Sequence, residues 1–283
     1  MLVLTAYIVI YTKQLVSTYC KAEEYLSFNH VMMALLSLFL VMIYGFQPGK
    51  NILAFGIIIV LGILDALANW LNFKLTDWGN PKDITAILNL SPIIGLLLYP
   101  IFSPILDLKP LKITVLIGIF IIIFGVLLII KNKGGFFVDT MKKHHMIRFF
   151  LFGVLLASIS AIFGYTYKWL LNDGGVNIPS FFLLRNIIMF SVYSIIFKSK
   201  WAWIKKEGKI QWFTLWRPFM VFIQFIGILY LYKIGNPLIT KVFLDGYIIA
   251  VLPLSYFILK DKITKIQILG SIIVLIGMFL LNV

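Results

Sequence analysis

Charged side chains interrupt several long apolar stretches of the chain, and these residues are the best candidates for binding ions, protons or polar ligands. A charge at the centre of a bilayer costs about 2.5–3.5 kcal/mol on insertion scales, so each one needs a partner, water or a function. The carboxylates could bind a proton or an ammonium group, and the bases could bind a carboxylate or a phosphate. The set comprises Asp65, Asp245, Lys13, Lys168, Arg185, Arg217, Lys241 and the titratable His30.

Asp65 begins a polar face. Asp65, Asn69 and Asn72 are spaced i, i+4 and i+7, so they lie on one side of a helix. In one interpretation this face lines a central cavity, where Asp65 binds a proton or a substrate ammonium group and Asn69 and the neighbouring Trp70 contact the substrate. The alternative is a hydrogen-bonded seam between helices, because Asn side chains can join helices in lipid.

Lys241 and Asp245 are also spaced i, i+4, and we expect them to neutralise each other. An internal repeat, described below, places Asn89 at the position equivalent to Asp245. In one interpretation these three residues give a substrate cavity one charged and one neutral wall, with Asp245 as a proton-coupling group. The alternative is a purely structural ion pair.

The other bases also have two interpretations. Lys13 and Lys168 either line the cavity or extend along their stems to the interface, which fits Lys168 better because it lies near the end of its helix. Arg185 and His30 act either as substrate clamps or as interfacial anchors, and His30 could couple protons because imidazole changes charge near neutral pH. Arg217 is predicted to reach a lipid headgroup.

Aromatic residues near helix ends belong by default to the interfacial belt of a membrane protein. Some instead lie close in the sequence to the polar positions above, and these are predicted to flank a ligand. They are Tyr165, Tyr167, Tyr247 and Trp70.

Composition indicates which elements must position these side chains. Of 283 residues, 61% are hydrophobic and 13% are charged, whereas a soluble domain is roughly 45–50% apolar and about 25% charged. This composition therefore disfavours a soluble enzyme. The net charge of +14 is explained by basic loops beside an anionic membrane surface, and we expect no nucleic-acid partner. The single cysteine, Cys20, excludes an internal disulfide, and no metal or other cofactor is expected.

Ten apolar runs have the length of a membrane-spanning helix, which needs about 20 apolar residues. Their continuous apolarity favours helices over barrel strands, which would alternate. We expect an all-α integral membrane protein in which the opening MLVLTAYIVI is a retained segment. The predicted spans are 2–20, 28–46, 52–73, 84–102, 112–130, 148–171, 179–197, 212–232, 237–258 and 264–282.

The two halves of the chain repeat. Lys13 and His30 are echoed by Lys168 and Arg185, each pair 17 positions apart, at an offset of 155. A GNP sequence at 79–81 returns at 235–237, and two glycines seven apart return near the end of each half, as Gly118 and Gly125 and as Gly270 and Gly277. The expected organisation is a first five-helix repeat at 1–133, a linker at 134–147 and a second five-helix repeat at 148–283. An odd number of helices in each copy inverts the second copy in the membrane.

The chain resembles the EamA-type transporters of the drug/metabolite transporter superfamily. The resemblance covers nearly the whole chain and is most specific at 253–281, PLSYFILKDKITKIQILGSIIVLIGMFLL; Arg185 lies in FFLLRNIIMF. Asp261 stands where the family usually has Glu, with Asp107 as a rougher counterpart in the first half, and His30 stands where an Arg is expected. The resemblance implies transport of a small metabolite and cytosolic termini, whereas the basic loops predict termini outside.

Together these features predict a secondary active transporter that moves a small polar metabolite, an amino acid or related amphoteric compound, by alternating access, with proton coupling as an option. The alternative is a flippase or a membrane enzyme acting on a lipid-linked substrate. The expected partners are the substrate and the lipid bilayer, in a monomer or dimer. We expect a multi-pass protein of a bacterial or archaeal plasma membrane.

Overall fold

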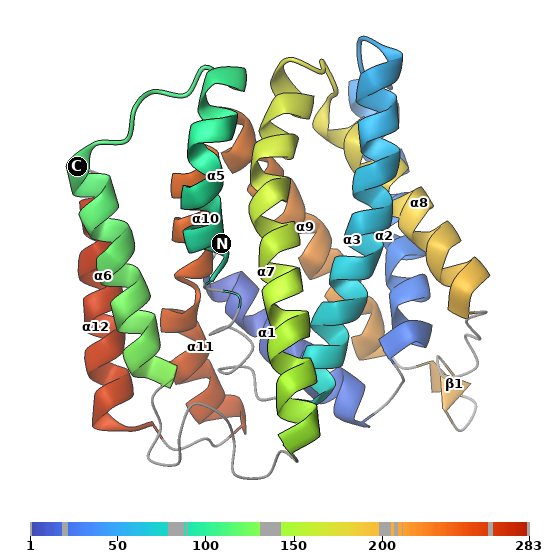
Figure 1. The fold of residues 1–283 in the computed structure, drawn as a ribbon. Coiled ribbons are helices and arrows are strands. Elements are labelled where there is room, and N and C mark those ends of the chain that lie inside the picture. The colour runs from blue at the N-terminus through green and yellow to red at the C-terminus, as the bar shows by residue number, and fades with distance from the viewer. Residues whose placement is uncertain are drawn as a thin grey trace. The chain divides into compact units, whose positions relative to one another are not determined.

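The protein is described by a computed structural model in which helices dominate. The backbone description covers residues 2–18, 22–78, 88, 90–130, 143–197, 205–206, 209–210, 212–259 and 263–281. The helices of the first half are α1 (Leu2–Thr18), α2 (Ala22–Tyr44), α3 (Ile52–Trp78), α5 (Ser91–Ile105) and α6 (Ile113–Ile130) (Figure 1). Those of the second half are α7 (Lys143–Asn172), α8 (Ile178–Phe197), α9 (Trp212–Ile234), α10 (Pro237–Asp245), α11 (Ile248–Leu254), a π-helical turn η2 (Ser255–Leu259) and α12 (Lys265–Leu280). Two short antiparallel strands, β1 (Lys205–Lys206) and β2 (Lys209–Ile210), precede α9.

The helices have the length and composition of membrane spans. Within the described residues, six segments are long and apolar enough to cross a membrane: Tyr25–Tyr44, Ile52–Leu75, Ile147–Asn172, Ile178–Ile196, Leu215–Ile234 and Pro237–Ile258. Four shorter apolar helices are Leu2–Thr12, Ser91–Ile105, Ile113–Ile129 and Lys265–Leu280. An α-helical membrane protein is therefore indicated, as predicted. That all ten segments cross the membrane stays a prediction.

One predicted span differs from the structure. The sequence predicted a single helix at 237–258, but α10 ends at Asp245 and α11 begins only at Ile248. At the break, the Gly246 amide donates to the Val242 and Phe243 carbonyls, each at 3.2 Å, and the Tyr247 amide donates to the Leu244 carbonyl at 3.2 Å. The bonds to Phe243 and Leu244 reach back three residues instead of four, which tightens the end of α10 and interrupts the regular helical ladder.

The chain divides into two compact units, and each draws on both halves of the sequence. The first unit comprises Met1–Ile10, Leu75–Tyr165 and Gly235–Val283, and the second comprises Tyr11–Lys74 and Thr166–Ile234. Helices α5, α6, α10, α11 and α12 thus lie in the first unit, and α2, α8 and α9 in the second. Tertiary packing therefore does not follow the order of the chain.

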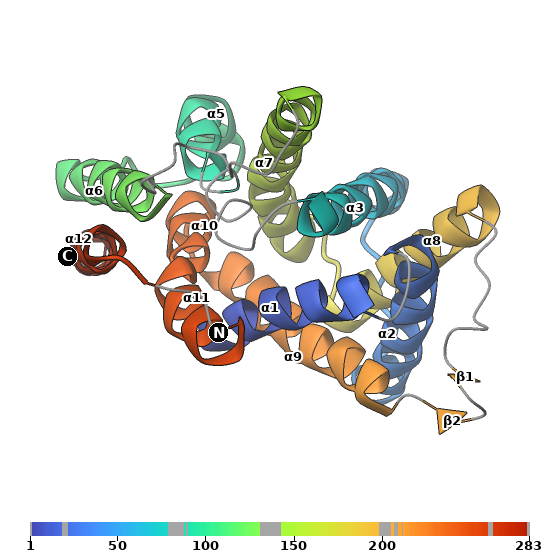
Figure 2. The same cartoon turned by 90° about the horizontal axis from the view of Figure 1, so that it is seen from below.

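A glycine seam joins α6 and α12 in the first unit, where both views show the two helices side by side (Figures 1 and 2). A Cβ added to Gly118 would lie 2.9 Å from the Gly277 carbonyl oxygen, and one added to Gly125 would lie 2.8 Å from the Gly270 carbonyl oxygen. Residue numbers rise along one helix as they fall along the other, so the helices are antiparallel. Glycines allow this close backbone approach because they have no Cβ.

The second unit is built on packing of α2 against α8 and α9. Its buried core includes Tyr25 and Leu26 of α2, Phe73 of α3, and Met189 and Tyr193 of α8. This packing brings the polar residues of α2, α3 and α8 into the interior of one unit.

The start of α12 offers a test of local helix stability. The Gln267 amide donates to Thr264 Oγ1 at 3.3 Å, and the Thr264 amide donates to Gln267 Oε1 at 2.9 Å, which together form a capping box. We expect Thr264→Ala to lower the free energy of unfolding by about 1 kcal/mol. Thr264→Ser keeps the capping oxygen and should lie close to wild type. Unfolding midpoints in detergent measure both, and equal losses for the two variants would contradict the capping role.

Candidate functional site

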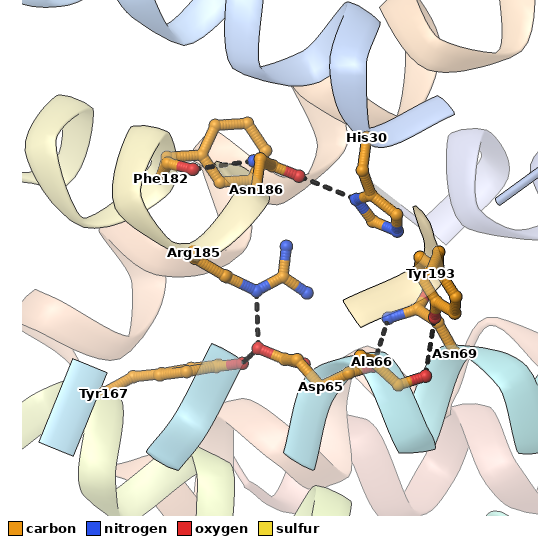
Figure 3. Close-up of polar contacts among 9 residues, drawn as sticks. All are labelled: His30, Asp65, Ala66, Asn69, Tyr167, Phe182, Arg185, Asn186 and Tyr193. Carbon is orange, nitrogen blue, oxygen red and sulfur yellow. Dashed lines mark hydrogen bonds and ion pairs between the residues drawn. The ribbon is translucent and has the colours of Figure 1, made fainter. Parts of the chain in front are cut away.

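An ion pair between Asp65 and Arg185 forms the centre of the candidate site in the second unit. Arg185 Nε on α8 donates to Asp65 Oδ2 on α3 at 2.5 Å, and both residues are only 3% exposed. The hydroxyl of Tyr167 on α7 donates to the same oxygen at 2.8 Å. Figure 3 shows the three side chains meeting in the protein interior. The carboxylate thus joins three helices, and it neutralises an arginine that would otherwise be costly to bury.

The guanidinium of Arg185 lies near two aromatic rings and has one nitrogen without a hydrogen-bond partner among the described residues. Its Cζ atom lies 4.0 Å from the centre of the Phe225 ring and 5.9 Å from that of Phe182. Contact with an aromatic face stabilises a buried cation. Within the described residues, Nη1 is buried without a hydrogen-bond partner. Arginine nitrogens are donors only, so this atom can bind an acceptor that the described structure does not supply.

His30 of α2 belongs to the same cluster. Its Nδ1 atom lies 2.8 Å from Asn186 Oδ1, and the Asn186 Nδ2 atom donates to the Phe182 carbonyl at 2.7 Å. The imidazole stacks on the Tyr193 ring with centroids 5.6 Å apart, and the Tyr193 hydroxyl donates to the Ala66 carbonyl at 2.5 Å. The His30 side chain is 1% exposed. In the described part of the chain, its Nε2 atom has no partner.

Arg217 does not reach a lipid headgroup, so that prediction was wrong. The residue is 6% exposed, and its Nε atom donates to Thr12 Oγ1 at 2.8 Å, while Nη1 donates to Asn29 Oδ1 at 3.0 Å. The guanidinium lies over the rings of Tyr25 and Phe73, at 5.3 and 4.9 Å. Its long side chain reaches the interior because α9 packs against α2. Among the described residues, both hydrogen-bond partners of Arg217 are uncharged.

Arg185 and His30 are likewise buried in the interior of this unit rather than exposed at a surface. The remaining residues of the predicted polar face behave differently. Asn69 Nδ2 donates to the backbone carbonyl of Asp65 at 2.9 Å, a bond within α3 rather than one that joins helices. Trp70 packs on the core of the second unit, and Lys74 Nζ lies 6.0 Å from its ring centre. The structure therefore brings Asp65 and Arg185 into one ion pair, with His30 nearby and Trp70 on the adjoining core.

The predicted ion pair between Lys241 and Asp245 is confirmed in the first unit. Lys241 Nζ donates to Asp245 Oδ1 at 2.6 Å, and Asp245 is 4% exposed. The other carboxylate oxygen, Oδ2, is buried, and the described residues give it no hydrogen-bond partner. Asp245 is the last residue of α10, directly before the break at Gly246. A buried carboxylate with a spare oxygen thus lies at an interrupted helix.

Two predicted ligand-flanking tyrosines are packed into the first unit. The Tyr165 hydroxyl donates to the Gly95 carbonyl at 2.7 Å, and its ring stacks on Phe102 with centroids 4.7 Å apart. Tyr247 packs with Ala6 and Val251. These contacts account for the burial of both rings.

The remaining predicted site residues are not part of either buried cluster in the described structure. The side chain of Lys13 and the whole of Asn89 lie outside the described part of the structure. Lys168 Nζ donates to the Lys233 carbonyl at 3.5 Å in an exposed position. Among the described residues, no group of three or more His, Cys, Asp or Glu side chains could hold a metal ion.

Sequence reasoning missed several members of the buried cluster. Tyr167 was considered only as a ligand-flanking ring, and the partners Asn186, Tyr193, Asn29 and Thr12 were not singled out. A signal was present for Asn186, which follows Arg185 directly within an apolar helix. Adjacent polar residues on a membrane helix can serve different partners because they point about 100° apart.

Comparison with known proteins supports the fold alone. No protein-family model matches the chain, and no curated protein matches it either. Among solved structures, the chain is similar to a crystal structure whose description names no function, with a TM-score of 0.73 and 12% sequence identity. The match covers 99% of this chain and 93% of the other. At that identity, the similarity concerns the arrangement of helices and not a substrate.

Proposed function

We propose that the protein is a secondary active transporter of the EamA type, which moves a small polar metabolite across a membrane by alternating access. The observation that carries the proposal is the buried cluster of Asp65, Arg185 and His30, within helices apolar enough to cross a membrane. Ionisable residues at membrane depth are costly and typically mark a substrate or ion pathway. The membrane is proposed to be a bacterial or archaeal plasma membrane.

The interrupted helix supports the same proposal. Transporters often form their binding sites from discontinuous helices, because freed backbone groups and helix ends coordinate substrates and ions near the bilayer centre. Here α10 ends at Asp245, whose Oδ2 atom has no partner among the described residues. Asp245 is therefore proposed as a proton-coupling group, together with Asp65 and His30.

The glycine seam supports ten spans arranged as two inverted five-helix repeats. The sequence repeat makes Gly118 equivalent to Gly270 and Gly125 equivalent to Gly277. The contacts are crosswise, with Gly118 facing Gly277 and Gly125 facing Gly270. A twofold axis that exchanges equivalent residues produces this pattern. It carries the contact between Gly118 and Gly277 onto the contact between Gly270 and Gly125. The helices α2 and α8, which also pack together, are the second helices of their halves.

A flippase or membrane enzyme acting on a lipid-linked substrate is the second candidate. Such an enzyme needs its reactive groups at a membrane interface, where the polar head of the substrate lies. Asp65 and Arg185 instead lie within the apolar spans Ile52–Leu75 and Ile178–Ile196. This position favours a carrier.

Counterflow in liposomes tests the proposal. Internal unlabelled substrate should accelerate entry of a labelled external one, with amino acids and related amphoteric compounds as the panel. We expect Asp245→Asn to lower the initial rate at least tenfold or to remove its pH dependence, because the amide cannot carry a proton. Asp107→Asn is the matched control, since Asp107 is outside the long apolar spans and its φ of 46° suits asparagine. The site assignment would be wrong if Asp65→Asn and Asp245→Asn both left transport and its pH dependence unchanged.

A further inference from the structure

The hydrogen bonds of Asn186 determine which nitrogen of His30 carries a proton. The Asn186 amide nitrogen donates to the Phe182 carbonyl, so its oxygen is the atom that faces His30 Nδ1 at 2.8 Å. An amide oxygen only accepts hydrogen bonds, so Nδ1 must carry the hydrogen. In a neutral imidazole the other nitrogen, Nε2, then has a lone pair and accepts. It becomes a donor only when it takes up a proton.

Two buried atoms of the same side-chain cluster have no hydrogen-bond partner among the described residues. They are Arg185 Nη1, a permanent donor, and His30 Nε2, an acceptor while the ring is neutral. Figure 3 shows the guanidinium of Arg185 on α8 and the imidazole of His30 on α2 within this cluster. An oxyanion would accept from Arg185, but it would face the Nε2 lone pair and be repelled. Protonation of Nε2 turns that repulsion into a second, charge-assisted hydrogen bond.

The charges around His30 lead to the same expectation. Among the described residues, the charged and titratable groups of this cluster are Asp65 from α3, Arg185 and Tyr193 from α8, Tyr167 from α7, and Arg217 from α9, which binds the adjacent Asn29. Asp65 and Arg185 neutralise each other, and tyrosines are uncharged in the ordinary pH range. Among the described residues, Arg217 then leaves one positive charge, and an imidazolium would add a second. A bound anion would offset the added charge, so anion and proton favour each other's binding.

We propose that the site binds a small oxyanion, such as a carboxylate, between Arg185 and His30, together with one proton taken from water by His30 Nε2. The proton and a monovalent anion add no net charge to the buried site, and no covalent bond of the ligand changes. The inference rests on the proposed transport function, because these buried groups meet water only when the protein changes conformation. The proposed site therefore requires an anionic group in the substrate, and it couples binding of the substrate to uptake of one proton.

Binding of simple anions to the purified protein in detergent tests this inference. Acetate and methanesulfonate are titrated by thermal unfolding between pH 5.5 and 8, against sodium chloride at matched ionic strength. One linked proton makes the apparent Kd fall about tenfold for each unit of pH decrease, over the range in which free His30 is neutral. Methanesulfonate stays ionised throughout, so its slope reports the protein alone. A shift equal to that of chloride, or an apparent Kd independent of pH, would overturn the inference.

Variants assign the proton to His30. His30→Gln supplies an amide donor that needs no protonation, so it should bind the anions with no pH slope. Ser191→Ala removes an exposed hydroxyl that donates to the Ile187 carbonyl of its own helix, α8, and should keep the wild-type slope. A slope retained in His30→Gln would contradict the assignment.

Calorimetry of the wild-type protein in two buffers of different ionisation enthalpy counts the protons taken up with each anion, whether or not the variant folds. One proton for each anion is expected, and none would refute the proposal.

The outcomes separate this inference from the proposed function. Counterflow without proton-linked anion binding would leave a transporter whose substrate does not use this site. Proton-linked binding without counterflow would leave the anion site standing and would contradict the transport function.

Discussion

Asp65→Asn is expected to lower the free energy of unfolding by about 3–5 kcal/mol, the range found when one partner of a buried ion pair is removed. The variant leaves the guanidinium of Arg185 without its carboxylate, at a position only 3% exposed. It also weakens the acceptor of the Tyr167 hydroxyl. Unfolding midpoints in detergent and counterflow in liposomes measure the two consequences, and we expect transport to be lost.

A double variant separates stability from function. Asp65→Leu combined with Arg185→Met replaces both charges by apolar groups of similar size, a change that is often neutral or stabilising at a buried pair. We expect near wild-type stability with no counterflow. Transport at the wild-type rate in the double variant would mean that the pair is purely structural. A stable Asp65→Asn protein would show instead that water or another group compensates Arg185.

Gly125→Val should separate α6 from α12 and lower the free energy of unfolding by about 1–3 kcal/mol. A Cβ at this position would lie 2.8 Å from the Gly270 carbonyl oxygen, 2.8 Å from Val274 Cγ2 and 2.9 Å from the Val274 amide nitrogen. Two of these atoms are backbone, so no side-chain rotation relieves the clash. The helices must move apart and lose van der Waals contact along the seam, and packing of this kind drives helix association in membranes.

Gly56→Val is the matched control for the seam. Gly56 also lies within a helix, α3, but a Cβ there would meet no atom within 4 Å. Both changes introduce the same side chain into a helix, so the difference between their unfolding midpoints reports the close approach. If both variants lost the same stability, helix propensity and not helix packing would explain the effect. Gly270→Val, which meets Gly125 from the opposite side at 2.6 Å, should repeat the loss.

The origin of the repeated glycines becomes clearer when the sequence repeat is compared with their contacts in the structure. The sequence shows that two pairs of glycines recur, which is compatible with either a duplication or a common helix motif. The structure shows that they contact crosswise in an antiparallel pair. The crosswise pattern links the repeat to a twofold arrangement, which supports the inverted-repeat proposal.

Features that depend on composition and on short spacings could be predicted from the amino-acid sequence. Long apolar runs predicted membrane helices because the bilayer requires about 20 apolar residues with internally satisfied backbone groups. The pair of Lys241 and Asp245 was predictable because residues four apart meet on any helix. Both follow from the local geometry of one helix.

Which charges meet across helices depends on how the helices pack. Asp65 and Arg185 are 120 positions apart, and their contact depends on the packing of α3 against α8, which no local pattern specifies. Arg217 was assigned to a headgroup because its place near the start of a helix suggests an interface, yet packing of α9 against α2 directs it inward to Asn29. The break after Asp245 was also missed, although Gly246 follows Asp245 directly and glycine is common at helix ends. A side chain's partner in the membrane is set by the neighbouring helix, and helix neighbours are fixed by the whole fold.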